Sequence, residues 1–570
     1  MKKETPNFND YPIRVPSIKT IDAKANALLD ELKKVKDAQE AKVVIRKWNR
    51  FFQKVETEIG VISVKYTLDI NNPKIKKAQD KCDEMRPLIA NYYNAYQKIL
   101  TSAPYRKSLE KAFGEYLFKM YDASLKGFDE KIIPDLIKEN KLVSEYDAVM
   151  GGAQIPFRGE TLNLSQLGKH LSSADREERK EAAIALDKWL GEHDETIGNI
   201  YDQMVKIRTE IARKLGYENY VELGYIFMGR TDYNAKDVAN YRAQISREIV
   251  PVAQKLYKDQ VKSLGIQNPQ YFDYALRFKS GNAKPLGDEK VLVKAAREMY
   301  EEMSPETHEF FEFMLSHNLM DLTARKGKQP GGYCTFFPLY KSPFIFSNFN
   351  GTEGDANVLC HEGGHAFQAY LCANFKIPEY MNPTMESCEI HSMSMEFFAW
   401  PYIDKFFGDD ADKYRFAHLS DAIEFLPYGI TVDEFQHWVY EHPEATHEER
   451  CQVWKEIENR YTPHKKYDEL PTLNSGRYWL RQGHIFSSPF YYIDYTLAQV
   501  VAFQFLVEDR INHEKAWEKY LKMTKCGGKY PFTELLRRNH LRNPFEEGNI
   551  AKVIKPLKRI LASFDTEKFN

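Results

Sequence analysis

The sequence has no long hydrophobic run and almost no net charge. No window approaches the roughly 20 apolar residues that cross a bilayer, and residues 1–10 carry two lysines with no apolar stretch behind them. The 80 Lys and Arg residues nearly balance 82 Asp and Glu residues, so no basic excess attracts phosphate backbones or anionic lipid. We therefore expect a chain that is neither exported nor membrane-inserted, without a nucleic-acid or membrane partner.

Cysteine is also scarce, with seven residues in a chain of 570. They form no C-x-x-C pair and their number is odd, which argues against a disulfide framework and favours a reducing, cytoplasmic location. Two of them, Cys360 and Cys388, adjoin the motifs described below, and we expect them to be small buried hydrophobic residues.

Internal repeats, low-complexity tracts and linker-like stretches are absent as well. The length exceeds the roughly 250–300 residues at which single cores stop growing, so we expect packed lobes that form one continuous body. From Ile21 to about Leu142, apolar residues at helical spacing predict long amphipathic helices. Pro87, Pro104 and Pro134 are expected to mark helix boundaries, because proline lacks the N–H that a helix interior needs.

The pattern changes after this stretch. Residues 153–164 alternate apolar and polar side chains around a glycine turn, which predicts a small β-hairpin. Residues 172–175 resemble a capped helix start, and helical spacing then continues. Dense Gly, Pro, Phe and Tyr between residues 326 and 351 predict short strands, and helices resume after Asn357. The fold class is therefore mainly α.

The most informative segment is His361-Glu362-Gly363-Gly364-His365. Residues four apart share one face of a helix, so His361 and His365 can direct both imidazoles at one Zn²⁺. Glu362 would then flank the open coordination position.

An alternative interpretation is a helix with two unrelated histidines beside a solvated glutamate. Apolar neighbours such as Leu359 and Phe367 indicate a buried helix, in which an unpartnered His-Glu-His cluster would be costly. Two successive glycines inside a helix each cost roughly 1 kcal/mol against alanine. They suggest that another backbone, such as a bound substrate, comes close at Gly363 and Gly364; a void or tight helix packing would explain them as well.

A catalytic zinc site needs a third protein ligand. Glu386, Glu389, Met393 and Glu396 are spaced 3, 4 and 3 apart, which places them on one face of the next predicted helix. We expect that helix to begin at residues 382–383, an asparagine cap followed by proline. Three carboxylates on one stripe favour a positive partner, and the alternative is a solvated acidic face.

The two motifs together resemble those of a known family. Residues 361–365, followed by residues 389–398, resemble the oligoendopeptidase F branch of the thimet-oligopeptidase-like zinc metallopeptidases. The resemblance implies one Zn²⁺ per chain, held by His361, His365 and Glu389, with Glu362 as the general base.

Three further carboxylates lie near these residues in the sequence. The resemblance implies that Glu396 is a second acidic position that orients a metal ligand. Glu386 has no counterpart in the family and is the runner-up for the third ligand. Asp355 could also orient a ligand, with a loop or helix-capping role as the alternative.

A further match lies at residues 483–495. Family members carry a histidine and a tyrosine cluster there, which hydrogen-bond to the substrate and to the tetrahedral oxyanion. The resemblance therefore implies catalytic roles for His484, Tyr492 and Tyr495, and the choice among Tyr491, Tyr492 and Tyr495 for the oxyanion stays open. Without the family match, these tyrosines would be interpreted as core residues and the histidine as a structural one.

The resemblance also carries expectations about architecture and substrate. It implies a two-lobed, multi-helix body around a deep central channel that admits only short, unstructured peptides. We expect an N-terminal helical lobe at 1–195, including the hairpin, and a catalytic region at 196–570. A small β element should lie next to the zinc-binding helix, where residues 331–333 resemble an edge strand that pairs with an extended peptide.

The sequence therefore predicts a zinc-dependent endopeptidase that hydrolyses internal bonds of short oligopeptides. The alternative is a helical peptide-binding or scaffold protein with a structural or incidental metal site, and a third possibility is a zinc hydrolase that acts on other substrates. Cleavage preference, physiological substrate and oligomeric state are not determined by the sequence.

Overall fold

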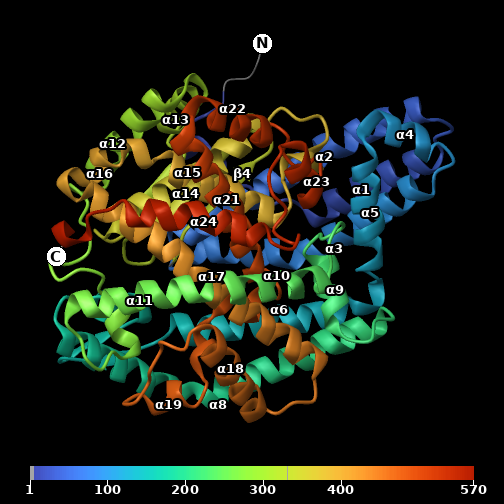
Figure 1. The fold of residues 1–570 in the computed structure, drawn as a ribbon. Coiled ribbons are helices and arrows are strands. Elements are labelled where there is room, and N and C mark those ends of the chain that lie inside the picture. The colour runs from blue at the N-terminus through green and yellow to red at the C-terminus, as the bar shows by residue number, and fades with distance from the viewer. Residues whose placement is uncertain (1–4, 330, 570) are drawn as a thin grey trace. The chain divides into compact units, whose positions relative to one another are not determined.

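A computed structural model describes residues 5–329 and 331–569, so the first four residues of the polar N-terminal segment lie outside it. The chain is mainly helical (Figure 1). Within the described ranges, no helix is both long enough and apolar enough to cross a membrane.

The chain divides into two compact units, each assembled from three segments. The first comprises Met1–Glu130, Lys284–Gly408 and Glu508–His540, and the second comprises Lys131–Ala283, Asp409–Val507 and Leu541–Asn570. The boundary expected at residue 195 falls inside the long helix α8 and coincides with no edge of either unit.

The first unit combines helices with a three-stranded sheet. Its elements are α1 (Ile18–Lys33), α2 (Ala38–Leu68), α3 (Pro73–Ser102), α4 (Arg106–Phe113), α5 (Glu115–Lys126), α12 (Glu289–Met303), α13 (Pro305–Ser316), β3 (Met320–Thr323), β4 (Tyr333–Phe337), β5 (Ser342–Phe349), α14 (Glu353–Cys372), α15 (Met385–Phe398), α16 (Asp404–Phe407), α22 (His513–Thr524) and α23 (Phe532–Arg538).

The second unit consists of helices and one hairpin. Its elements are α6 (Ile133–Gly151), β1 (Ile155–Phe157), β2 (Glu160–Leu162), α7 (Leu164–Leu171), α8 (Arg176–Lys214), α9 (Tyr220–Phe227), α10 (Ala235–Glu248), α11 (Val250–Leu264), α17 (Ala411–Glu441), α18 (His447–Tyr461), α19 (Pro471–Asn474), α20 (Gly483–Ser487), the start of α21 (Tyr492–Ile511) and α24 (Asn549–Ala562).

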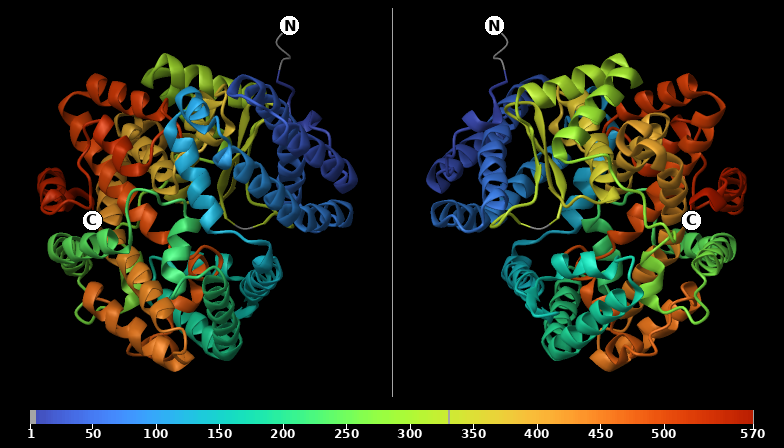
Figure 2. Two further views of the ribbon diagram at one scale, coloured as in Figure 1. Left: turned by 90° about the vertical axis from the view of Figure 1, so that its right-hand side faces the viewer. Right: turned by 90° about the vertical axis from the view of Figure 1, so that its left-hand side faces the viewer.

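The sheet of the first unit has the order β3-β5-β4. Strand β5 is parallel to β3 and antiparallel to β4, with Tyr333 opposite Phe346 and Thr335 opposite Phe344. Strand β5 pairs with a neighbour on each side, and its residues are buried almost throughout. Helix α14 packs on β5 and β4, and α2 contacts β4 (Figure 2). The prediction of a mainly helical chain with a small β element beside the helix of residues 361–365 is confirmed.

The other local predictions are mostly confirmed. Strands β1 and β2 form the hairpin, with Gly159 in the left-handed region at φ 86°. Pro104 lies between α3 and α4, and Pro134 lies in the first turn of α6. The prediction for Pro87 is wrong, because α3 continues through it to Ser102. Cys82 and Met85 on the preceding turns are buried in a core cluster, and such packing offsets the roughly 3 kcal/mol that an internal proline costs.

Candidate metal centre

Helix α15 lies in the interior of the first unit. Every residue from Glu389 to Phe398 is buried, so the acidic stripe is not a solvated face. The expected helix start at residues 382–383 is wrong: the helix begins at Met385 and Thr384 occupies the cap position. Thr384, which a start at residues 382–383 would place inside the helix, is extended at ψ 156°, and the preceding loop is held by the Gly528 N–H, which donates to the carbonyl of Tyr380.

Helix α14 meets α15 by direct backbone contact at Gly364. A Cβ atom at this position would lie 2.6 Å from the carbonyl oxygen of His391 and 2.7 Å from the Cα atom of Ser392, both on α15. The neighbouring Gly363 faces the hydroxyl of Tyr300 on α12 just as closely. Tight helix packing therefore explains the glycine pair, and the close backbone belongs to the protein itself.

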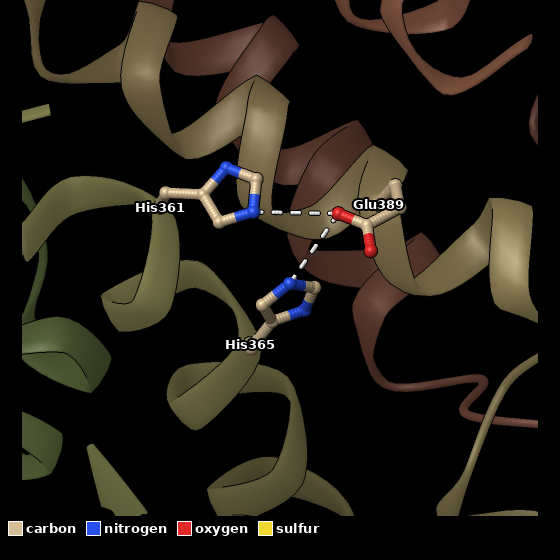
Figure 3. Close-up of side chains that lie close together, drawn as sticks. All are labelled: His361, His365 and Glu389. Carbon is tan, nitrogen blue, oxygen red and sulfur yellow. Dashed lines mark ion pairs between the residues drawn. The ribbon is translucent and has the colours of Figure 1, made fainter. Parts of the chain in front are cut away.

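This contact brings three metal-ligating side chains together. One donor atom from each of His361, His365 and Glu389 lies within 4.8 Å of the other two. Glu389 Oε2 is 3.3 Å from His361 Nε2 and 3.4 Å from His365 Nε2 (Figure 3). Tetrahedral ligands at about 2.0–2.1 Å from one ion are about 3.3–3.4 Å apart, so the donor set fits a single divalent cation.

The site is buried on one side and accessible on the other. The side chains of His361 and His365 keep 21% and 20% of their exposure, whereas Glu389 keeps 5%. Of the described residues, this group supplies three protein donors. Three donors with accessible imidazoles leave a coordination position for water or substrate, as catalytic sites require and closed structural sites do not.

Glu396 fixes the orientation of the first imidazole. Its Oε1 is 2.6 Å from His361 Nδ1, so this nitrogen carries the proton and Nε2 is directed at the donor group. Glu386 is also buried on α15, but it is not a member of the donor group. The geometry therefore favours Glu389 over Glu386 as the third ligand.

The charges of the site shift the pKa values of its members. Burial alone would lower the pKa of His361, but its hydrogen bonds to Glu389 and Glu396 raise it well above the usual value. Burial would raise the pKa of Glu389, but the two imidazoles hold it well below its usual range. Burial raises the pKa of Glu362, against the opposing effect of both histidines. A carboxyl with a raised pKa is suited to accept and return a proton near neutral pH.

Other residues near the motifs have structural contacts. Asp355 accepts hydrogen bonds from the backbone N–H groups of Asn350 and Gly351, at 3.0 and 2.7 Å, which favours the loop role over ligand orientation. Cys360 is buried as expected, whereas Cys388 is only half-buried and its thiol lies 3.6 Å from the carbonyl of Pro383. All seven cysteines lie within the described ranges, and none of them forms a disulfide.

The second predicted cluster lies in the second unit, where α20 carries His484 and the first turn of α21 carries Tyr492 and Tyr495. His484 Nε2 is 3.4 Å from the hydroxyl of Tyr495, and the rings of His484 and Tyr492 are 5.1 Å apart. The structure therefore brings the predicted histidine and tyrosines together.

Two polar neighbours of His484 were not predicted. The Gln482 side-chain amide donates to His484 Nδ1 at 2.8 Å and accepts from the Tyr428 hydroxyl at 2.7 Å. Proximity in sequence to His484 was the one available signal for Gln482. No pattern links Tyr428 to this site, because it is on α17.

Family models identify the protein family to which the chain belongs. The model of peptidase family M3 matches residues 169–553, and the model of the peptidase M3 N-terminal domain matches residues 8–128. The chain belongs to peptidase family M3. The chain is thus a peptidase, and M3 peptidases are metallopeptidases.

Solved structures support the same assignment for this M3 peptidase. A structure assigned to oligoendopeptidase F is 46% identical with a TM-score of 0.96, and the match covers 99% of this chain and all of the other. PZ peptidase A with an inhibitor is 47% identical with a TM-score of 0.95, covering 98% and 99%. A structure from Bacillus anthracis assigned to oligoendopeptidase F is 44% identical with a TM-score of 0.91, covering 99% of this chain and 100% of the other. Comparison with curated proteins gives no match.

The backbone contact at Gly364 predicts the effect of a small substitution. Gly364→Ala places a Cβ against the backbone of α15, which has no flexible side chain to move aside. We expect a loss of about 1–3 kcal/mol in the free energy of unfolding of the M3 peptidase, as for overpacked cores, together with weaker metal binding because Glu389 is displaced. Denaturant titration and metal analysis measure the two effects.

Gly354→Ala is the matched control on the same helix, because nothing lies nearer than 3.4 Å to a Cβ there. It should leave both measurements close to those of the parent protein. Equal metal affinity in Gly364→Ala and the parent would show that the helix contact does not set the site.

A second pair of variants separates the two candidates for the third ligand. Glu389→Gln should lose stoichiometric metal, because a neutral amide is a poor ligand beside two imidazoles. Glu386→Gln, an equally buried substitution on the same helix, should keep it. Elemental analysis after dialysis distinguishes them, and the reverse pattern would make Glu386 the ligand.

Proposed function

We propose that the protein is a zinc-dependent endopeptidase that cleaves internal bonds of short, unstructured oligopeptides. The observation that carries this proposal is the three-donor group of His361, His365 and Glu389, with Glu362 next to the first donor on α14. Family membership supports peptide chemistry, and relatives named oligoendopeptidase F support oligopeptides as the substrate class. Imidazole and carboxylate donors in this number are typical of catalytic zinc.

The protein's own residues supply the proton transfers. Zn²⁺ bound there would lower the pKa of water and polarise the scissile carbonyl. Glu362 accepts the proton of the attacking water and returns it to the leaving amine, for which its raised pKa is suitable. Glu396 holds the imidazole of His361 in the tautomer that leaves Nε2 available.

His484 and Tyr495 are proposed to stabilise the developing oxyanion. Because Gln482 donates to His484 Nδ1, the proton of the neutral imidazole is on Nε2, which faces the hydroxyl oxygen of Tyr495. A hydroxyl that accepts from His484 can donate its own hydrogen to a substrate oxygen. This direction of the hydrogen bond favours Tyr495 as the residue that donates to the oxyanion, while Tyr492 packs against the imidazole of His484.

Strand β4 is the proposed docking edge for the peptide backbone. It lies at the end of the order β3-β5-β4 and is half-buried over most of its length, so an extended peptide could add to it. We also propose a cytoplasmic location, since seven cysteines without a disulfide among the described residues fit a reducing compartment.

The assigned base can be tested by an isosteric change. Glu362→Gln should retain zinc, because Glu362 is not among the donors, and lose about 10²–10⁴-fold in kcat because no carboxylate accepts the proton. Metal analysis and cleavage of a quenched fluorescent peptide measure both. His365→Ala is the contrasting variant and should lose metal and activity together. Near-normal turnover in Glu362→Gln would refute the role of the base.

The reaction class can be tested with a mixed peptide pool and fragment identification by mass. Oligopeptides should be cut at internal bonds, a chelator should abolish cleavage, added Zn²⁺ should restore it, and a folded protein of similar composition should resist. Metal at full occupancy without any hydrolysis would instead indicate a structural site in a peptide-binding protein.

A further inference from the structure

Residues 488–491 connect α20, which carries His484, to α21, which carries Tyr495, and this four-residue link contains an unusual backbone conformation. Phe490 has φ 66°, in the left-handed region. For a bulky side chain this conformation is unfavourable and persists only where the surroundings enforce it. It follows Pro489 and is separated by Tyr491 from the first residue of α21, Tyr492.

Two side chains from distant elements hold the backbone of Phe490. Its N–H donates to Gln436 Oε1 on α17 at 2.9 Å. Its carbonyl accepts from Arg230 Nη2 at 2.6 Å, and the same nitrogen donates to Asp494 Oδ1 at 2.7 Å. The side chains of Arg230 and Asp494 have no exposed surface, so this ion pair is shielded from screening by solvent.

The ring of Phe490 is held as firmly as its backbone. It is fully buried and contacts the rings of Tyr225, His437 and Tyr440, with centroids 4.8–5.6 Å apart. Gly224 on α9 makes room for it, since a Cβ there would lie 2.5 Å from a ring carbon. Phe490 is therefore anchored through both its backbone and its side chain.

We propose that Gln436 and Arg230 are positioning residues that hold Phe490 in the left-handed conformation and thereby set His484 against Tyr495. The direction of the chain at Phe490 determines how α21 leaves the turn that carries His484. If Phe490 relaxed to an ordinary conformation, the 3.4 Å contact between His484 Nε2 and the Tyr495 hydroxyl would open. This inference rests on the roles proposed above for His484 and Tyr495.

The second unit offers a matched pair of glutamines for the test. Gln504 on α21 is also buried, and it likewise accepts from a backbone N–H, that of Arg542, at 2.8 Å. It donates to a backbone carbonyl at 3.1 Å, and Gln436 does so at 3.2 Å. Gln436→Met and Gln504→Met therefore remove the same kinds of hydrogen bond, at Phe490 and away from it.

Both variants should lower the thermal midpoint by a similar amount and keep the parental metal content. Gln436→Met alone should lose about 10- to 100-fold in kcat, as for a catalytic group misplaced by about 1 Å, with KM changed by less than about threefold. Arg230→Lys keeps the positive charge near Asp494, but its ammonium ends one bond short of the Nη2 that reaches the Phe490 carbonyl, so it should show the same kinetic pattern. If Gln436→Met does not fold, Arg230→Lys tests whether the hold on Phe490 positions His484 against Tyr495.

An NMR measurement tests the positioning of His484 independently of peptidase activity. In full-length protein with ¹³C-labelled histidine, the imidazole resonance of His484 is assigned by its loss in His484→Gln. It should shift in Gln436→Met and stay in place in Gln504→Met. A parent protein that cleaves no peptide would refute the proposed function, while this comparison would still decide the positioning claim. An unchanged His484 resonance in Gln436→Met, or equal kcat losses in both glutamine variants, would overturn it.

Discussion

The backbone contact between α14 and α15 at Gly364 is the constraint on which the metal centre depends. Two histidines one turn apart on α14 can share a cation, but the third donor comes from another helix. Glu389 reaches them because the main chain of α15 lies directly on the glycine. The roughly 1 kcal/mol that each internal glycine costs is thus offset by the close packing that builds the site.

Burial and charge act together at this site. Glu389 stays ionised in the interior because two imidazoles oppose the effect of burial, and His361 is oriented by a second buried carboxylate, Glu396. A divalent ion bound there would neutralise part of the negative charge of the buried carboxylates on α15. Glu362 has a different environment, in which burial raises its pKa and suits it to proton transfer.

Most helices and strands, and the two histidine donors, could be predicted from the sequence because they depend on local spacing. The interval between His361 and His365, the hairpin around Gly159 and the strands near residue 340 follow from periodicity and turn chemistry. The start of α15 and the continuous helix through Pro87 depend on tertiary contacts that override local preference. The hold of Gln436 on Phe490 spans 54 residues, and no local pattern encodes it.

We propose that two imidazoles and one carboxylate hold a single zinc ion with a coordination position left for solvent. X-ray absorption spectroscopy of the zinc-loaded protein tests it most directly. We expect a first shell of nitrogen and oxygen at about 2.0–2.2 Å, with the multiple scattering of two imidazoles. A sulfur shell at about 2.3 Å, which would implicate a cysteine such as Cys360 or Cys388, or a shell without imidazole, would contradict it.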